Sequence, residues 1–186
     1  MYLIFKRWHE GLFVLDREKY SPVKANVDIE LVLIDRTNAA LVGPLREERY
    51  VSQFAEQLNM GDVGYYAYLE GCPIGYGWVK HPGSVDYFFK IGEGARYLCR
   101  FFVCEQARGR GIYPALITAL IEHEGETNRF YIARERGNVA SERGLLKVGF
   151  KHVGEYAFLR GFKHTFNKRK LKGFHNDVRR KNEPEG

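Results

Sequence analysis

Two glycines alternate with two arginines between a strand-like apolar segment and a helix-like apolar segment. The turn reads Arg108-Gly109-Arg110-Gly111, and Ile112 begins the segment that follows. The start of a helix carries unpaired backbone N–H groups and a partial positive charge. Glycine permits positive φ and a close approach to the backbone, and arginine adds fixed charge. The turn is therefore a candidate site for a phosphate or pyrophosphate.

Other nucleotide-binding motifs fit this turn less well. The chain contains no G-x-x-x-x-G-K-[ST] sequence, which excludes a Walker loop. The dinucleotide motif G-x-G-x-x-G fails as well, because its third glycine falls on Pro114. A tight turn without a ligand is the alternative interpretation of so short a pattern.

The elements around the turn predict an α/β fold. Strands are expected at Tyr97–Val103, Arg129–Arg134 and Lys151–Arg160, with helices at Ile112–Glu124 and Asn138–Val148. Strand, helix, strand, helix and strand in so short a stretch require at least one parallel pair.

The first half of the chain predicts antiparallel strands and one helical region. A β-hairpin is expected from residues 2–8 and 12–16, with its turn at Glu10-Gly11. Further strands are expected at Asp28–Asp35, Val63–Glu70, Ile74–Lys80 and Tyr87–Ile91. A helical region is expected from Thr37 or Asn38 to Met60, broken near Gly43-Pro44.

Composition and charge are those of a globular chain with a basic C-terminal end. Of the 186 residues, 45% are hydrophobic and 28% are charged, which argues against wholesale disorder. The formal net charge is +6, and residues 163–186 hold eight Lys/Arg against three Asp/Glu. This end is either a solvated terminus or a surface for an anionic partner.

No segment predicts export, a membrane span or a metal site. The longest uncharged apolar run, residues 111–121, falls short of the ~20 residues that a membrane helix needs. The N-terminus does not resemble a signal peptide, so a cytoplasmic location is expected. Cys72, Cys99 and Cys104 form no C-x-x-C pair, and the histidines are scattered, which predicts reduced thiols and no metal.

Two segments resemble the GNAT superfamily of acetyl-CoA-dependent N-acyltransferases. Residues 103–116, V-C-E-Q-A-R-G-R-G-I-Y-P-A-L, are similar to its acetyl-CoA-binding motif, R/Q-x-x-G-x-G/A. Residues 138–150, N-V-A-S-E-R-G-L-L-K-V-G-F, are similar to its N-x-x-A/S-x-x-L-Y-x-K-x-G-F helix. The resemblance spans about residues 28–160. It implies a mixed, mostly antiparallel sheet with a parallel, splayed strand pair, flanked by helices.

The resemblance also implies a division of the chain. Residues 1–26 are an N-terminal hairpin or extension, and residues 27–162 are the acetyltransferase domain. Residues 163–186 are a basic segment that includes a last strand and a tail.

Roles for individual residues follow from the same resemblance. Acetyl-CoA is the expected co-substrate, with its pantetheine arm along the strand edge and its pyrophosphate on the turn. The backbone N–H of Val103 is expected to polarise the thioester carbonyl, as an oxyanion donor would. The expected coenzyme-binding residues are Phe102, Val103, Cys104, Arg108, Gly109, Arg110, Gly111, Ile112, Tyr113, Asn138 and Ser141.

Two departures from the family pattern matter for the chemistry. Tyr113 stands where the motif has glycine or alanine, and Leu145 stands where the family often has a tyrosine that protonates the leaving thiolate. Leucine cannot supply general acid catalysis. Glu105 and Glu70, each near the end of a strand, are the candidate general bases, with surface charges as the alternative interpretation.

The predicted function is acetyl transfer from acetyl-CoA to an amine by direct attack. A small-molecule acceptor is favoured over a protein, with an anionic acceptor as one option. A degenerate member that binds coenzyme A or acts as an interaction module is a second hypothesis. Binding of an anionic partner through the basic tail is a third, although no nucleic-acid motif is present. The oligomeric state is open, with a homodimer as one option.

Overall fold

The computed structural model describes residues 6–82, 89–161, 164–166 and 178–180. The strands of the main sheet are β1 (Lys6–Asp16), β2 (Glu30–Leu33), β3 (Val63–Leu69), β4 (Cys72–Lys80), β6 (Ala95–Val103), β7 (Arg129–Glu135), β8 (Lys151–Gly161) and β9 (His164–Phe166). The strands β5 (Phe89–Ile91) and β10 (Val178–Arg180) form a separate pair. The helices are α1 (Val42–Leu45), α2 (Arg49–Asn59), α3 (Ile112–His123) and α4 (Val139–Val148).

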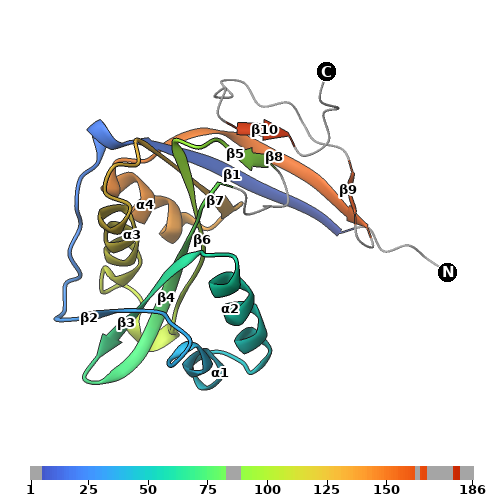
Figure 1. Ribbon diagram of the computed structural model, residues 1–186. Helices are drawn as coiled ribbons and strands as arrows, with labels where there is room; N and C mark the ends of the chain where they lie inside the picture. Colours follow the sequence, from blue (N-terminus) through green and yellow to red (C-terminus); the bar gives the residue numbers. More distant parts are fainter. Residues whose placement is uncertain (1–5, 83–88, 162–163, 167–177, 181–186) are drawn as a thin grey trace.

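The main sheet has eight strands in the order β2-β3-β4-β6-β7-β1-β8-β9. Helices α3 and α4 cover one face of the sheet, and α1 and α2 lie on the other (Figure 1). β6 and β7 are parallel, and the other neighbouring strands run antiparallel. The prediction of a mixed, mostly antiparallel sheet with one parallel pair and flanking helices is confirmed.

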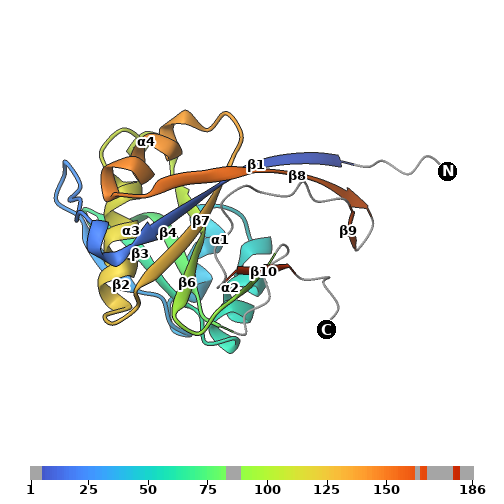
Figure 2. The ribbon, with the colours of Figure 1, turned by 90° about the horizontal axis from the view of Figure 1, so that it is seen from above.

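The expected N-terminal hairpin is wrong, because residues 6–16 form a single strand. β1 lies between β7 and β8 and pairs with both, and its outer half continues along β8 (Figure 2). Gly11 does not turn the chain. A Cβ at Gly11 would lie 3.1 Å from Glu155 Oε1 and 3.2 Å from His152 Nε2. Neighbouring side chains fill the space that a Cβ would occupy, so this position requires glycine. In the sequence alone, such a glycine cannot be distinguished from one in a turn.

The helical region after β2 breaks later than expected. Gly43 and Pro44 lie inside α1, and the chain leaves helical geometry at Arg46, with φ −134° and ψ −70°. Proline fits there because the N–H groups of a first helical turn have no intrahelical partner. Asn38 makes no side-chain cap. Arg46 therefore lies in the short segment between α1 and α2, outside both helices.

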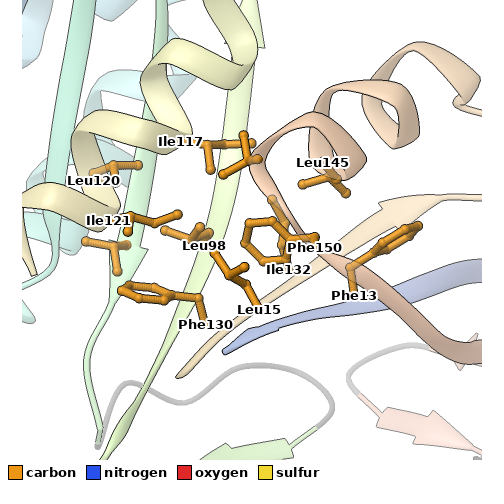
Figure 3. Packing of buried hydrophobic residues seen from close by; sticks show 12 residues of the cluster. Phe13, Leu15, Leu98, Ile117, Leu120, Ile121, Phe130, Ile132, Leu145 and Phe150 are labelled. Atoms are coloured by element: carbon orange, nitrogen blue, oxygen red, sulfur yellow. The ribbon is translucent and has the colours of Figure 1, made fainter. Parts of the chain in front are cut away.

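The core is divided by the sheet. On the α3–α4 face, Phe13 and Leu15 of β1 pack with Ile117 of α3, Leu145 of α4 and Phe150 (Figure 3).

On the other face, Phe54 of α2 packs against Tyr66, Tyr76 and Trp78. The Phe54 ring centre lies 4.8 Å from that of Tyr76 and 5.0 Å from that of Trp78. The sheet is therefore held by buried apolar side chains on both faces.

Two further findings concern membrane spans and the basic C-terminal segment. Among the described residues, no helix is long and apolar enough to cross a membrane. In the basic C-terminal segment, β9 pairs with the end of β8 and β10 pairs with β5. The other residues of that segment, 163, 167–177 and 181–186, lie outside the described residues, so the role predicted for the tail stays a prediction.

Candidate active site

A cavity opens where the two parallel strands separate. β6 pairs with β7 only from Ala95 to Leu98, and its remaining residues turn away from β7. The cavity has a volume of about 740 Å³. It is lined by β6, the glycine turn, the first turn of α3, the end of β7, and α4.

Aromatic side chains of β6 lie on both faces of the sheet beside a bulge. The register of β6 against β4 shifts between Tyr76 and Trp78, and Arg100 takes a left-handed conformation with φ 55°. The Phe101 ring meets that of Tyr113 of α3 at 5.1 Å, whereas Phe102 stacks on Tyr76 at 5.6 Å. Neighbouring strand residues point to opposite faces, and the extra residue at the bulge places Cys99 and Phe102, three positions apart, on the same face. Phe101 and Phe102 thus line one cavity from opposite faces.

The backbone of Val103 faces away from β4. Val103 stands opposite Gly75, and the next N–H, that of Cys104, donates to the Ile74 carbonyl at 2.8 Å. In an antiparallel pair, N–H groups alternate between the neighbouring strand and the opposite side. The N–H of Val103 therefore points toward the separation of β6 and β7, where β6 has no paired strand.

The glycine turn ends at the first residue of α3. Gly109 and Gly111 are both left-handed, with φ 78° and 75°, and Gly111 is the N-cap. Within the part of the chain that the structure describes, no hydrogen bond uses the N–H groups of residues 109–113. The Arg110 carbonyl accepts from Asn26 N–H at 2.8 Å, which holds the turn in place. The turn presents five backbone donors at the positive end of a helix.

The first turn of α4 forms the opposite wall. Asn138 caps the helix, because its Oδ1 accepts from the Ser141 N–H at 3.0 Å. Ser141 Oγ donates to Tyr113 Oη at 2.9 Å, which links α4 to α3 across the cavity. A Cβ at Gly144 would lie 2.8 Å from the Tyr113 ring. The family-type leucine is missing at position 144, and the Tyr113 ring takes up that space.

Burial also changes the acidity of the Tyr113 phenol. Desolvation raises the pKa of Tyr113 to about 12, although the hydrogen bond with Ser141 acts in the opposite direction. The phenol is therefore neutral at ordinary pH and serves as a hydrogen-bonding wall of the cavity.

Most of the predicted coenzyme-binding residues line this cavity. They are Phe102, Val103, Arg108, Gly109, Gly111, Ile112, Tyr113, Asn138 and Ser141. Cys104 and Arg110 do not line it. Cys104 packs beside a small apolar cluster, and Arg110 is exposed.

The predicted bases lie elsewhere. Glu105 is exposed in the short helical turn after β6, and Glu70 is exposed in the turn between β3 and β4. Neither lines the cavity.

Two histidines with carboxylate partners and Leu145 also lie outside the cavity. His81 Nε2 contacts Glu124 Oε1 at 2.8 Å, and His152 Nε2 contacts Glu155 Oε1 at 3.1 Å. Leu145 is fully buried in the core. An apolar side chain at position 145 therefore fits a role in core packing.

The sequence did not single out several residues that line the cavity. They are Cys99, Arg100, Arg134, Glu135, Arg143 and Lys147, the last quoted only as a motif match. Among the described lining residues, five are cationic (Arg100, Arg108, Arg134, Arg143 and Lys147) and Glu135 is the one carboxylate. No sequence signal places them together, because a bulge and the end of a strand decide which side chains face the cavity.

Comparison with known proteins identifies the family. The sequence pattern of the acetyltransferase (GNAT) family matches residues 32–150. The chain therefore belongs to the GNAT family. A search of curated proteins finds no match.

Solved structures show the same fold at low sequence identity. One is a GNAT-family acetyltransferase from Colwellia psychrerythraea, with a TM-score of 0.62 and 15% identity. The match covers 86% of this chain and 57% of that one, so this chain spans less than two thirds of its length. A putative GNAT acetyltransferase from Novosphingobium aromaticivorans has a TM-score of 0.55 and 13% identity, covering 82% and 63%.

A third structure is AAC(6')-Iy in complex with the bisubstrate analog CoA-S-monomethyl-acetylneamine. It has a TM-score of 0.56 and 15% identity, and the match covers 77% of this chain and 99% of that one. At such identities the likeness concerns the fold.

Proposed function

We propose that this protein is an acetyl-CoA-dependent N-acetyltransferase that moves the acetyl group directly to a small-molecule amine. The observation that carries this proposal is the cavity itself. It combines a strand edge at Val103 that pairs with no second strand, the unpaired backbone N–H groups of Gly109 and residues 111–113 at a helix start, and a lining with five cationic side chains and one described carboxylate. A long anionic molecule with an amide-bearing arm fits these three features together.

The residues that would hold acetyl-CoA form a continuous donor side, defined here as residues 108–113 and 138–147. The N–H groups of the glycine turn face a pyrophosphate, and Arg108 and Arg143 add charge. At the edge of β6, the backbone N–H of Val103 is open to the pantetheine arm, whereas the backbone groups of Phe102 face β4 and the Val103 carbonyl accepts from Arg108 Nε at 3.3 Å. The resemblance to a structure with a coenzyme A analog supports this arrangement.

When bound, acetyl-CoA supplies an activated thioester. The Val103 N–H, directed into the separation of the strands, is the group that we assign to its carbonyl oxygen. A coenzyme thiol with an ordinary pKa of ~8.5 leaves without a proton donor at position 145. The buried Leu145 therefore agrees with activity.

Acceptance of the amine proton is assigned to Glu135. It is the one carboxylate that lines the cavity among the described residues, whereas Glu105 and Glu70 do not line it. An ammonium group with a pKa near ~10 must lose a proton before it attacks. Glu135→Gln should lower kcat by about 10²–10⁴-fold and leave coenzyme A affinity unchanged, with Glu105→Gln as the control.

The donor side is tested with a pair of matched glycines. Gly109 and Gly71 have nearly equal left-handed φ, 78° and 77°, and a Cβ at either meets nothing within 4 Å. Gly109→Ala and Gly71→Ala should therefore lose similar stability, about 1–2 kcal/mol. Only Gly109 lines the cavity.

Calorimetric titration with coenzyme A should show at least about tenfold weaker binding to Gly109→Ala alone. Equal affinities in the two variants would contradict the pyrophosphate assignment. Tight coenzyme A binding without thiol release from acetyl-CoA, across a panel of amines, would favour the second hypothesis, a binding module.

A further inference from the structure

The cavity reaches the second face of the sheet, opposite the donor side. Phe101 and Tyr113 belong to the α3–α4 side, whereas Cys99 and Phe102 pack with the α2 cluster. All four line the same cavity. Because the donor side occupies the α3–α4 face, the acceptor must approach through the opening on the α2 face. We call this side of the cavity the acceptor mouth and define it by Arg100 and Phe102, which line the cavity, and by Arg46 and Tyr76, which pack against Phe102.

Arg46 is fixed in the acceptor mouth by aromatic groups. Its Nη1 donates to Tyr76 Oη at 2.6 Å. Its guanidinium carbon lies 4.0 Å from the centre of the Tyr50 ring and 5.0 Å from that of Phe102. Cation–π contacts hold a guanidinium without neutralising it. The break in the helical region at Arg46 is what brings this side chain to β4.

Arg100 reaches the same place from the bulge of β6. Its Nη1 donates to Gln53 Oε1 of α2 at 2.9 Å, and the residue lines the cavity. Burial raises the pKa of Tyr76, and the guanidiniums of Arg46 and Arg100 both oppose that rise. Two positive charges therefore act on one phenol.

Some described arginines are paired with carboxylates, whereas Arg46 and Arg100, like Arg17, Arg36, Arg108 and Arg143, are not. Arg49, Arg96, Arg129 and Arg134 each form an ion pair with a carboxylate. Throughout the ranges that the structure describes, no carboxylate forms an ion pair with Arg46 or Arg100. Two preorganised cations without counter-charges at the mouth of a cavity favour an anionic ligand.

We infer that the acceptor is an amine that carries a carboxylate, and that Arg46 and Arg100 bind this carboxylate at the acceptor mouth. This inference rests on the proposed function. Guanidinium groups match the planar geometry of a carboxylate. The ring of Phe102, which stacks on the buried Tyr76, provides an apolar surface for the carbon chain between the carboxylate and the amine.

The test uses product analogs, so it does not require turnover. N-acetylglycine, N-acetylglutamate and N-acetylphenylalanine are each titrated beside the α-carboxamide of the same compound, with and without saturating coenzyme A. At least one acid should bind about tenfold or more tightly than its amide. Arg46→Gln and Arg100→Gln should each remove most of this preference.

Arg49→Gln is the matched control, because Arg49 lies in the same segment and pairs with Glu47 at 2.8 Å. The Arg49→Gln variant should prefer the acid over its amide as strongly as the wild type does. The inference is overturned if no acid binds more tightly than its amide, or if the preference survives in both variants. N-acetyl-O-phosphoethanolamine, a product analog with a phosphate in place of the carboxylate, is titrated as well. If it binds more tightly than every acid, the carboxylate assignment is overturned.

Failure of the proposed function gives a different result. In that case coenzyme A itself does not bind, while the acid–amide comparison without coenzyme A still decides the role of the two arginines. Coenzyme A affinity should be unchanged in Arg46→Gln.

Discussion

The donor side and the acceptor mouth face each other across one cavity, but the chain builds them differently. The donor side comes from two short contiguous segments, residues 108–113 and 138–147. The acceptor mouth combines a helix break at Arg46, a strand residue at Tyr76 and a bulge at Arg100. Backbone groups dominate the first, and side chains dominate the second. In the function that we propose, a contiguous motif holds the coenzyme and positions scattered along the chain bind the acceptor.

The largest expected effect is a loss of stability at Leu145. Helix α4 has residues that pack in the core and residues that line the cavity, and this change distinguishes the two roles. Leu145 is fully buried, whereas Ser141 and Gly144 of the same helix line the cavity. Leu145→Ala should lower the free energy of unfolding by about 2–5 kcal/mol. The kcat of the folded variant should stay within about twofold of the wild type, measured by thiol release at low temperature. A folded variant that binds acetyl-CoA but loses turnover by orders of magnitude would give position 145 a direct role.

A second change should damage both regions together. Gly77 lies under the Phe101 ring at the β6 bulge, and a Cβ there would overlap that ring. Gly77→Val should cost about 1–3 kcal/mol of stability. Coenzyme A affinity and the preference for acids should fall together, because the bulge places residues on both faces. Gly94→Val is the control, since a Cβ at Gly94 meets nothing within 4 Å. Loss of only one of the two binding properties would show that the regions are independent.

A third change should affect the donor side alone. Gly144→Leu restores the family-type leucine but places a side chain where the Tyr113 ring lies. It should cost about 1–3 kcal/mol of stability and weaken coenzyme A binding. The double variant Tyr113→Ala, Gly144→Leu should recover most of both losses, measured by urea unfolding and calorimetry. No recovery in the double variant would contradict the volume exchange between these positions.

The smallest expected effect is a loss of folding stability at alkaline pH. The pKa of Tyr113 is raised from 10.0 to about 12, so the neutral phenol stabilises the folded state. This stabilisation is complete below pH 10 and is lost as the pH rises through 12. At pH 11 the loss should be about 1 kcal/mol. Urea unfolding at pH 9 and pH 11 should show a smaller decrease for Tyr113→Phe than for the wild type. Equal decreases would mean that Tyr113 ionises normally.

The same contrast explains what the sequence could predict. The glycine turn and the Asn138 helix were predicted because each is a local pattern with caps and glycines at defined positions. Glu135, Arg134 and Arg100 face the cavity for non-local reasons, namely where β7 ends and where β6 bulges. Periodicity does not encode a bulge, because one extra residue reverses the faces of all that follow. The acceptor mouth therefore emerged only with the structure.

The position of β1 between β7 and β8 has a consequence for biosynthesis. β1 leaves the ribosome before either of its neighbours, and more than a hundred residues separate Asp16 from Arg129. At cellular translation rates that interval lasts on the order of 10 s. During this time Phe13 and Leu15 lack the strand partners that bury them in the native core. Such long-range pairing makes folding slow and leaves apolar surface exposed on the nascent chain. β1 can take its place in the sheet only after β7 and β8 have been synthesised.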